Sequence, residues 1–515
     1  MRNKKIIYVL VLVLLLSLIA GCGQTNNQNE ENEVSKTSAG SEGSSEPVKD
    51  SVVIAIEADV TTFDPHYLAS TTNGNVYTNI YNTLVELGES SDEIIPCLAE
   101  DWEISEDNTI WTIKLNKGVK FHNGEELKAS DVVFSLNRAK ASPYLASQTS
   151  QIKDVKEIDD YTVQVALTEP YAPFLLSMHQ VYILNEKAVT EGGEAYSENP
   201  VGTGPYKFVR HDIAERIVLE RFDEYFRGPA SIKNVDYKVI TDPNTTLIAL
   251  ETGEVDFAYV IPMISRQSII DNPELTTHEF ESIRLSYTIM NNEIEPFNNL
   301  LVRQAINYAV DKESIVQIAE EGMGEVTNSI FNKQIFGYSE NVKGYEYNIE
   351  KAKELLTEAG YPDGFEVSLK TMEGSTKKVA EIIQEDLNKI GITAKVEVCE
   401  KNAYIQDIMA GNYDMGILGV TVGTDAEFFS RCFLSTGALN VSKYNNPRVD
   451  ELFSEGKEIL DKEERLKIYE ELAQILVDDA VIVPLYFPIW VYAADKDLKI
   501  RHIDCGTVKV VDLSW

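Results

Sequence analysis

The amino-acid sequence predicts an α/β protein that is divided into more than one domain. Between residues 349 and 398, a helix pattern, a strand pattern, a second helix and a second strand follow one another, which is typical of a partly parallel sheet. The chain has 515 residues, more than the roughly 250–300 at which a single hydrophobic core stops growing. Hydrophobic residues make up 43% and charged residues 25%, a composition that favours folded domains over disorder.

The first 22 residues have the organisation of an export signal. Arg2, Lys4 and Lys5 precede the apolar run Ile6–Ala20, which is shorter than the ~20 residues that span a bilayer comfortably. The ending at Cys22, Ile19-Ala20-Gly21-Cys22, resembles the bacterial lipoprotein lipobox, in which this Cys is lipidated and becomes the mature N-terminus. We therefore expect a lipid anchor on Cys22, with a plain signal peptide as the alternative.

Residues 23–50 are predicted to form a flexible linker, because they are mostly Asn, Glu, Ser, Gly and Gln and cannot build a core. Folded structure is expected from Ser51 onward. Apolar or alternating patterns predict strands over Val52–Ile56, Trp111–Leu115 and Tyr161–Val165. Apolar residues at helical spacing predict a helix with Ser130 as its N-cap.

The region from 285 to 484 alternates more regularly between helices and strands. Asn348 is the predicted N-cap of a helix that Gly360 ends. The buried strand Tyr413–Leu418 leads into the loop Gly419–Asp425, and loops at the carboxyl ends of such strands bind ligands in α/β sheets. The apolar stretch Val481–Ala494 follows the last helix. The other predicted elements here are helices over 298–310, 314–321, 379–390 and 464–477 and strands over 366–370 and 393–398.

The charge balance excludes one large class of partners. There are 46 Lys and Arg residues against 83 Asp and Glu residues, giving a formal net charge of −37. Nucleic-acid binding requires a clustered basic surface, so no nucleic-acid partner is expected. Most of the carboxylates must be solvated surface groups.

Catalytic and cofactor signatures are not found. The sequence contains no Walker A, dinucleotide-binding, zinc-protease or serine-hydrolase motif. His66 and His122 are interpreted as hydrogen-bonded structural residues. Neither the six His nor the scattered Cys have the spacing of a metal site. No enzyme activity, cofactor or metal site is therefore predicted. Disulfide bonds and buried free thiols both remain open for Cys97, Cys399, Cys432 and Cys505.

Seven segments together resemble the large extracytoplasmic solute-binding proteins of ABC importers, in the peptide/nickel-binding family (family 5). The segments occur in the family's order and span most of the chain after Ser51. They are Thr62–His66, Pro96–Trp102, Lys117–Gly124, Gly202–Tyr206, Gly253–Asp256, Val302–Asp311 and Ala352–Pro362.

The resemblance implies a two-lobed periplasmic-binding-protein-like fold, with a hinge and an extra subdomain in the first lobe. The expected boundaries are 51–284 for lobe I with its inserted subdomain, 285–484 for lobe II, and 485–515 for the return to lobe I. A ligand would be enclosed between the lobes by hinge closure, because it binds the closed state better.

The resemblance also implies which residues bind the ligand. One wall of the cleft would be the loop Ser70, Thr71, Thr72 and Asn73, although these residues can equally cap a turn. The opposite wall would be the loop after Leu418, where peptide binders carry Gly-Trp-x-x-Asp. This chain has Gly419, Val420 and Thr421 there, with Gly423 at the Asp position. Asp425 either replaces that Asp as the partner of a ligand ammonium group or is a surface charge. Tyr486 and Trp490 are the predicted aromatic contacts.

We therefore predict a monomeric, lipid-anchored binding component of an ABC importer, which delivers its ligand to permease subunits in the membrane. Peptide is the expected substrate class. The altered loop makes an opine-like compound, a metal chelate or an oligosaccharide the alternative, because a buried ammonium group without a counter-charge is costly. A surface sensor of peptide signals and an extracytoplasmic hydrolase are the other hypotheses.

Overall fold

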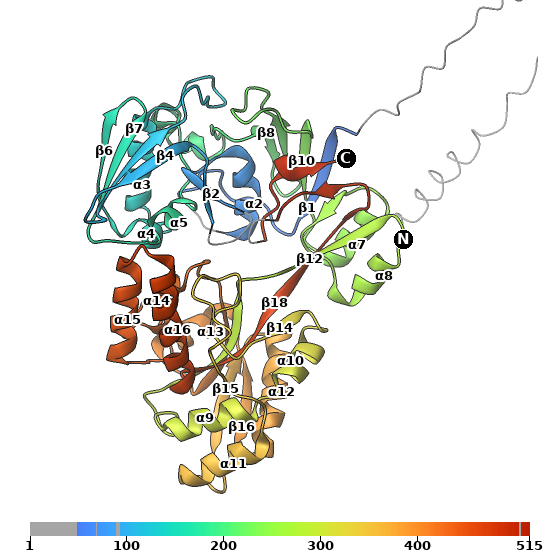
Figure 1. Cartoon of the computed structure of the whole chain (residues 1–515). Coiled ribbons are helices and arrows are strands. Elements are labelled where there is room, and N and C mark those ends of the chain that lie inside the picture. Colours follow the sequence, from blue (N-terminus) through green and yellow to red (C-terminus); the bar gives the residue numbers. More distant parts are fainter. Residues whose placement is uncertain (1–48, 68–69, 89–92, 504–505) are drawn as a thin grey trace, which may run out of the picture. The chain divides into compact units, whose positions relative to one another are not determined.

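The computed structural model describes residues 49–67, 70–88, 93–503 and 506–515. The predicted signal segment, Cys22, Cys505 and all but the last two residues of the predicted linker lie outside these ranges. The described residues form two lobes of mixed α/β structure, which confirms the predicted fold class (Figure 1). No helix within the described ranges is both long enough and apolar enough to cross a membrane.

Lobe I is built around strand β1 (Ser51–Ile56), which pairs in parallel with β10 (Asn234–Val239) and β11 (Phe257–Ala258). Antiparallel strands β9 (Arg216–Arg221) and β8 (Tyr206–Asp212) extend this sheet beyond β10. Alternate residues Val52 and Ile54 of β1 are completely buried in the core. The helices of this lobe include α2 (Thr71–Ile80), α7 (Pro243–Glu251) and α8 (Arg266–Ile270).

A subdomain with its own core is inserted into lobe I. Its four-stranded antiparallel sheet has the order β4 (Ala99–Ile104), β5 (Ile110–Leu115), β7 (Thr162–Leu167) and β6 (Ile152–Asp159). Helix α3 (Ala129–Ala141) packs on this sheet, and α4 (Ala146–Thr149) and α5 (Phe174–Met178) lie nearby. Ser130 was predicted to be the N-cap of α3, but the cap is Lys128. The helix begins earlier because the Asp131 carboxylate accepts the Lys128 backbone N–H at 3.0 Å.

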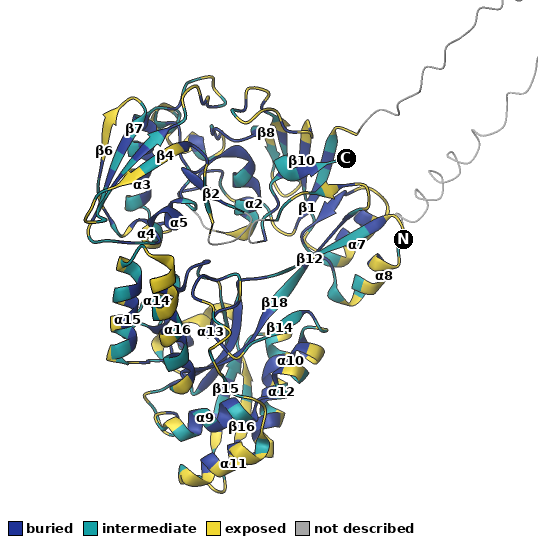
Figure 2. Ribbon diagram, in the orientation of Figure 1, coloured by how far each residue is buried: buried dark blue, intermediate teal, exposed yellow. Residues whose placement is uncertain are grey.

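Lobe II contains strands in the order β16 (Thr393–Val398), β15 (Glu366–Thr371), β17 (Met415–Val420), β13 (Leu285–Met290) and β18 (Ile482–Asp495). Helices with one buried and one exposed side surround the sheet (Figure 2). The predicted cap Asn348 accepts the Lys351 N–H at 2.9 Å. The helices are α9 (Leu300–Ala309), α10 (Lys312–Ala319), α11 (Ile349–Glu358), α12 (Ser375–Lys389), α13 (Lys401–Ala410), α14 (Ser430–Phe433), α15 (Pro447–Glu458) and α16 (Lys462–Asp478).

Two neighbouring stretches of chain connect the lobes. One is β12 (Leu275–Glu281) followed by β13, and the other is the 14-residue strand β18, which lies in both lobes. β12 pairs with β18 from Leu275 opposite Asp495 to Glu281 opposite Ile489. β13 then pairs with β18 from Ser286 opposite Tyr486 onward. The predicted apolar stretch 481–494 corresponds to this strand.

The lobes also touch at a point far along the sequence from these connections. Lys457 on α15 forms an ion pair with Glu169 of the subdomain, with 2.8 Å between Nζ and Oε1. The Ala172 backbone N–H donates to the Lys457 carbonyl oxygen at 2.6 Å. Figure 1 shows α14 and α15 next to α4 and α5 in this region. The two lobes are therefore in contact on both sides of the space between them.

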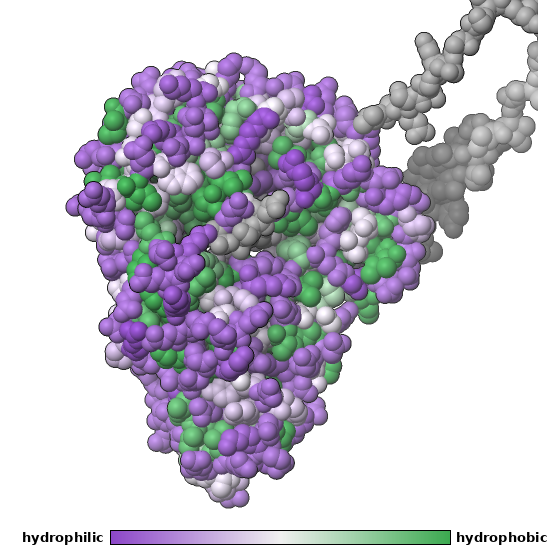
Figure 3. Space-filling view, viewed as in Figure 1, coloured by the Kyte–Doolittle hydropathy of each residue, from purple (hydrophilic) through white to green (hydrophobic). Residues whose placement is uncertain are grey.

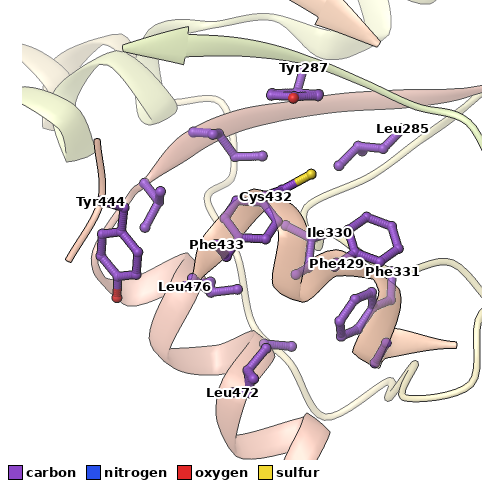
Figure 4. Close-up of a cluster of buried hydrophobic side chains, with 14 of the residues drawn as sticks. Leu285, Tyr287, Ile330, Phe331, Phe429, Cys432, Phe433, Tyr444, Leu472 and Leu476 are labelled. Atoms are coloured by element: carbon purple, nitrogen blue, oxygen red, sulfur yellow. The ribbon is translucent and has the colours of Figure 1, made fainter. Parts of the chain in front are cut away.

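Both histidines that were interpreted as structural form hydrogen bonds. His66 Nε2 lies 2.9 Å from the Tyr182 carbonyl oxygen, and His122 Nε2 lies 3.0 Å from that of Gly204. Burial lowers the pKa of each to about 4. The three described cysteines, Cys97, Cys399 and Cys432, form no disulfide. Figure 4 shows Cys432 within the apolar cluster of lobe II, close to Phe429, Phe433 and Leu285.

Candidate ligand-binding site between the lobes

A cavity of about 620 Å³ lies between the lobes and beside the crossing strands. Its size is within the range of about 300–1,000 Å³ that is usual for small-molecule sites. On the face drawn in Figure 3, hydrophobic residues gather between the upper and lower parts, and hydrophilic residues cover most of the remainder. The lining residues come from β1, α2 and the segment 259–263 of lobe I, from β13 and β18, and from the ends of α10, α12 and β17 in lobe II.

The structure brings five of the predicted ligand-binding residues together around this cavity. They are Thr71, Thr72, Gly419, Tyr486 and Trp490. The Trp490 ring also packs against Phe280, with 5.6 Å between ring centroids. That these residues contact a ligand stays a prediction.

The other predicted residues of the first wall have structural roles. The Ser70 hydroxyl caps α2 by accepting the Asn73 backbone N–H at 3.2 Å. The Asn73 amide donates to the Tyr77 hydroxyl at 2.7 Å. The cavity lining among the described residues includes neither of them, nor Val420 and Thr421. Local capping therefore accounts for the positions of Ser70 and Asn73.

Asp425 occupies neither of its two expected positions, since it lies outside the cavity lining and is not a surface charge. Its carboxylate accepts hydrogen bonds from Arg465 Nη2 at 2.9 and 3.0 Å. The two side chains are only 5% and 7% exposed. A buried guanidinium requires a counter-charge, and Asp425 supplies it. The Asp425 carboxylate, one of the expected partners of a ligand ammonium group, is therefore paired with Arg465 within lobe II.

Glu427 adds a second buried carboxyl group beside this ion pair. Burial, followed by the negative charge of Asp425, raises the pKa of Glu427 to about 8. Tyr171 of the subdomain lies against the same group of charges, and burial raises the pKa of its hydroxyl. This buried cluster belongs to the contact between α15–α16 and the subdomain.

Arg284 is a cavity residue that sequence reasoning missed. It lies between β12 and β13, and its guanidinium covers Gly419. A Cβ atom at Gly419 would lie only 2.4 Å from Arg284 Nη2 and 2.7 Å from Cζ. A side chain at position 419 would therefore displace the end of the flexible Arg284 side chain from this place. The β13–β17 pairing, with Ser286 opposite Gly419, brings the two residues together.

Glu320 and Tyr486 form a polar group in the cavity on which the charge of Arg284 acts. The Tyr486 hydroxyl donates to Glu320 Oε1 at 2.6 Å. Burial raises the pKa of Glu320, and the hydrogen bond from Tyr486 opposes this shift. Ser286 lies beside the Tyr486 hydroxyl and Ser375 beside Glu320. Sequence reasoning missed Glu320 as well, because the end of a helix carries no local ligand-binding signal.

The cavity therefore has charges of both signs. Arg284 provides a cation, and Glu57, Glu320 and Glu321 provide carboxyl groups. Within the described ranges, no group of three or more His, Cys, Asp and Glu residues is arranged to hold a metal ion. The arrangement suits capture of a polar small molecule that carries charge.

Two lobes joined by paired crossing strands, with a cavity between them, define the class of bilobed ligand-binding proteins. The family model "Bacterial extracellular solute-binding proteins, family 5 Middle" matches residues 93–440. The chain belongs to this family, whose members are the solute-binding components of ABC importers. The family resemblance predicted from the sequence motifs is confirmed.

Curated relatives match over most of their length. The chain is 31% identical to "Heme-binding protein A" of Haemophilus influenzae over 461 residues, covering 82% of this chain and 84% of the relative. It is 30% identical to the "Dipeptide-binding protein" of Escherichia coli over 472 residues, covering 84% and 88%. These relatives are named as binding proteins rather than enzymes.

Solved structures have the same fold. HbpA2 from Haemophilus parasuis superposes with a TM-score of 0.84 at 28% identity, covering 90% of this chain and 99% of that one. DppA from Helicobacter pylori, solved in complex with the peptide STSA, superposes with a TM-score of 0.76 at 30% identity, covering 91% and 98%.

Proposed function

We propose that this chain captures a small ligand, with peptide as the first substrate class, and delivers it to the permease of an ABC importer. The observation that carries this proposal is the cavity between the lobes, which has Arg284 and the carboxyl groups of Glu57, Glu320 and Glu321 in its lining. Short peptides carry both an ammonium and a carboxylate group. The dipeptide-binding relative and the peptide-bound DppA structure support the same class.

A non-peptide solute is the second candidate. The loop at 419–423 lacks the Trp and Asp of the peptide-binding motif, and Asp425 pairs with Arg465 instead. MoaA, whose structure was solved with mannopinic acid, superposes with a TM-score of 0.75 at 25% identity. An opine-like compound, a metal chelate or an oligosaccharide therefore belongs in the same screen.

Thermal unfolding of residues 23–515 against peptides, opines, metal chelates and oligosaccharides tests the proposal. A ligand at 100 times its Kd adds about 2.7 kcal/mol of stability, which for a chain of this size is a shift of about 3 °C. A shift with peptides supports the first candidate, and a shift with another class alone supports the second. Turnover of a bound compound would contradict both and favour a hydrolase.

We also propose that lipid on Cys22 anchors the protein at the outer face of the cell membrane, as a monomer. The motif Ile19-Ala20-Gly21-Cys22 supports the anchor. Cys22→Ser is expected to move the protein from the membrane fraction to the medium, whereas an unchanged distribution would contradict lipidation. Light scattering of residues 23–515 measures the oligomeric state directly.

A further inference from the structure

Arg284 lacks a partner of its own. Within the described ranges, its guanidinium forms no ion pair and no hydrogen bond, although the side chain is only partly exposed. The buried arginines behave differently: Arg303 donates to the Phe297 and Asp479 carbonyl oxygens, and Arg465 donates to Asp425. Arg284 therefore has guanidinium N–H donors without a hydrogen-bond acceptor among the described residues.

Three carboxyl groups line the cavity together with Arg284, those of Glu57, Glu320 and Glu321. Glu320 interacts electrostatically with Arg284, but its carboxylate accepts from Tyr486 and lies beside Ser375. No ion pair within 4.0 Å joins Glu320 to Arg284 among the described residues, although the charge of Arg284 acts on Glu320. Because Arg284 is only partly exposed and lines the cavity, its guanidinium is available to an acidic group of the ligand.

A second feature favours the same sign of ligand charge. The first turn of α12 contributes Ser375 and Thr376 to the cavity lining, and no side chain caps this helix. Unpaired N–H groups and the helix dipole make a helix N-terminus favourable for an anion. Arg284 and this helix end thus line one cavity.

We propose that Arg284 binds the carboxylate of the transported ligand, and that Gly419 leaves the space in which the guanidinium lies. A planar guanidinium matches a carboxylate through two parallel N–H···O bonds. This inference rests on the proposed function and narrows it to ligands that carry a carboxylate. It makes Arg284 and Gly419 specificity-determining residues.

Gly419 allows a test that leaves the charge unchanged. A Cβ atom there would lie 2.4 to 2.8 Å from Nη2, Cζ and Nε of Arg284. Gly419→Ala therefore displaces the group without removing it. Lys378 is a matched control, because it is an exposed cation whose charge also acts on Glu320.

The experiment compares two probes that differ at a single group: a mixture of Ala-X dipeptides with a free C-terminal carboxylate, and the same mixture as C-terminal amides. Binding to residues 23–515 is measured by thermal shift and then by calorimetry. The wild type is expected to prefer the acids. Arg284→Gln is expected to weaken acid binding about 30-fold or more, to the level of the amides. Gly419→Ala should also reduce the preference, while Lys378→Gln should retain it.

The remaining outcomes separate the two proposals. Equal binding of acids and amides by the wild type, or an acid preference that survives in Arg284→Gln, would overturn the carboxylate assignment and leave the importer function intact. A wild-type shift with neutral oligosaccharides alone would overturn it as well. If no probe or library compound shifts the wild type, the proposed function itself is contradicted. The unfolding temperature of each variant without ligand shows whether Arg284 has a merely structural role.

Discussion

Asp425→Ala is expected to destabilise lobe II by about 3–5 kcal/mol, because it leaves the Arg465 guanidinium buried without a counter-charge. The pair is bonded through both carboxylate oxygens, and the Arg465 side chain is 7% exposed. Arg465 Cζ also lies 4.7 Å from the Phe336 ring centroid, so the guanidinium cannot reach solvent without disturbing the core. Asp425 additionally accepts the Glu427 N–H at 2.9 Å, a bond worth about 1 kcal/mol. Asp425→Asn keeps an acceptor for that bond and should be slightly less destabilised.

Urea unfolding of the wild type and the variants measures the effect, and hydrogen exchange locates it in α15 and α16. The double variant Asp425→Ala/Arg465→Met removes both charges and should recover most of the loss, since an apolar replacement of a buried pair is often neutral or better. Glu366→Ala is the matched control. Glu366 pairs with Lys395 at 2.5 Å, but both side chains are mostly exposed, so no measurable loss is expected.

One result would refute this reasoning. If Asp425→Ala unfolds like the wild type but no longer binds the ligand, then Asp425 faces the cavity in solution and the ion pair with Arg465 does not stabilise the fold. Destabilisation with intact ligand affinity is the expected pattern.

Glu427→Gln removes a carboxyl group whose pKa in the folded state is raised to about 8. The folded state binds this proton more tightly than the unfolded state does. The free energy of unfolding of the wild type, relative to the variant, should therefore fall between about pH 5 and pH 8 and stay constant above that range. Urea unfolding at several pH values measures this difference. Glu169→Gln removes the partner of Lys457 and should weaken ligand binding by about 2- to 5-fold in calorimetry, because the contact between the lobes is partly exposed. Burial raises the pKa of Cys97 to about 12; maleimide should therefore label it at pH 8 only after unfolding, as read by mass spectrometry.

Each of these outcomes has a control or a contrary result. Glu385→Gln, at an exposed position of α12, is the control for removing a carboxyl group as such. A pH-independent difference for Glu427→Gln would mean that this carboxyl group is already ionised when folded. Unchanged affinity in Glu169→Gln would show that the contact with Lys457 does not favour the closed state. Rapid labelling of native Cys97 would mean that its region opens readily.

The fold was predictable where hydrophobic periodicity and caps act locally. Asn348 begins α11 as expected, because its side chain needs only a backbone N–H three residues away. The apolar run that became β18 could be recognised because both of its faces are covered by protein. The prediction of Ser130 as the N-cap was wrong, because the Asp131 carboxylate accepts the Lys128 backbone N–H and the helix begins earlier.

The site was only partly predictable, because its decisive contacts depend on strand order and register. Arg284 and Gly419 are neighbours only because β13 pairs with β17 in one specific register. Asp425 and Arg465 lie on different elements and no local pattern connects them. The resemblance to the family predicted that the loop after Leu418 lies at the site. Which residues contact Gly419 and Asp425 depends on the tertiary structure.

The shared strand β18 also determines when each lobe can be completed during synthesis. The core beside β1 includes Tyr492, Val508 and Leu513, and Trp515 Nε1 donates to the Ser51 carbonyl oxygen at 3.0 Å. A ribosome makes all of lobe II between these two parts of lobe I. The core around β1 can therefore be completed only after the segment 489–515 has been synthesised. A premature stop after lobe II would leave lobe I incomplete and open to proteases.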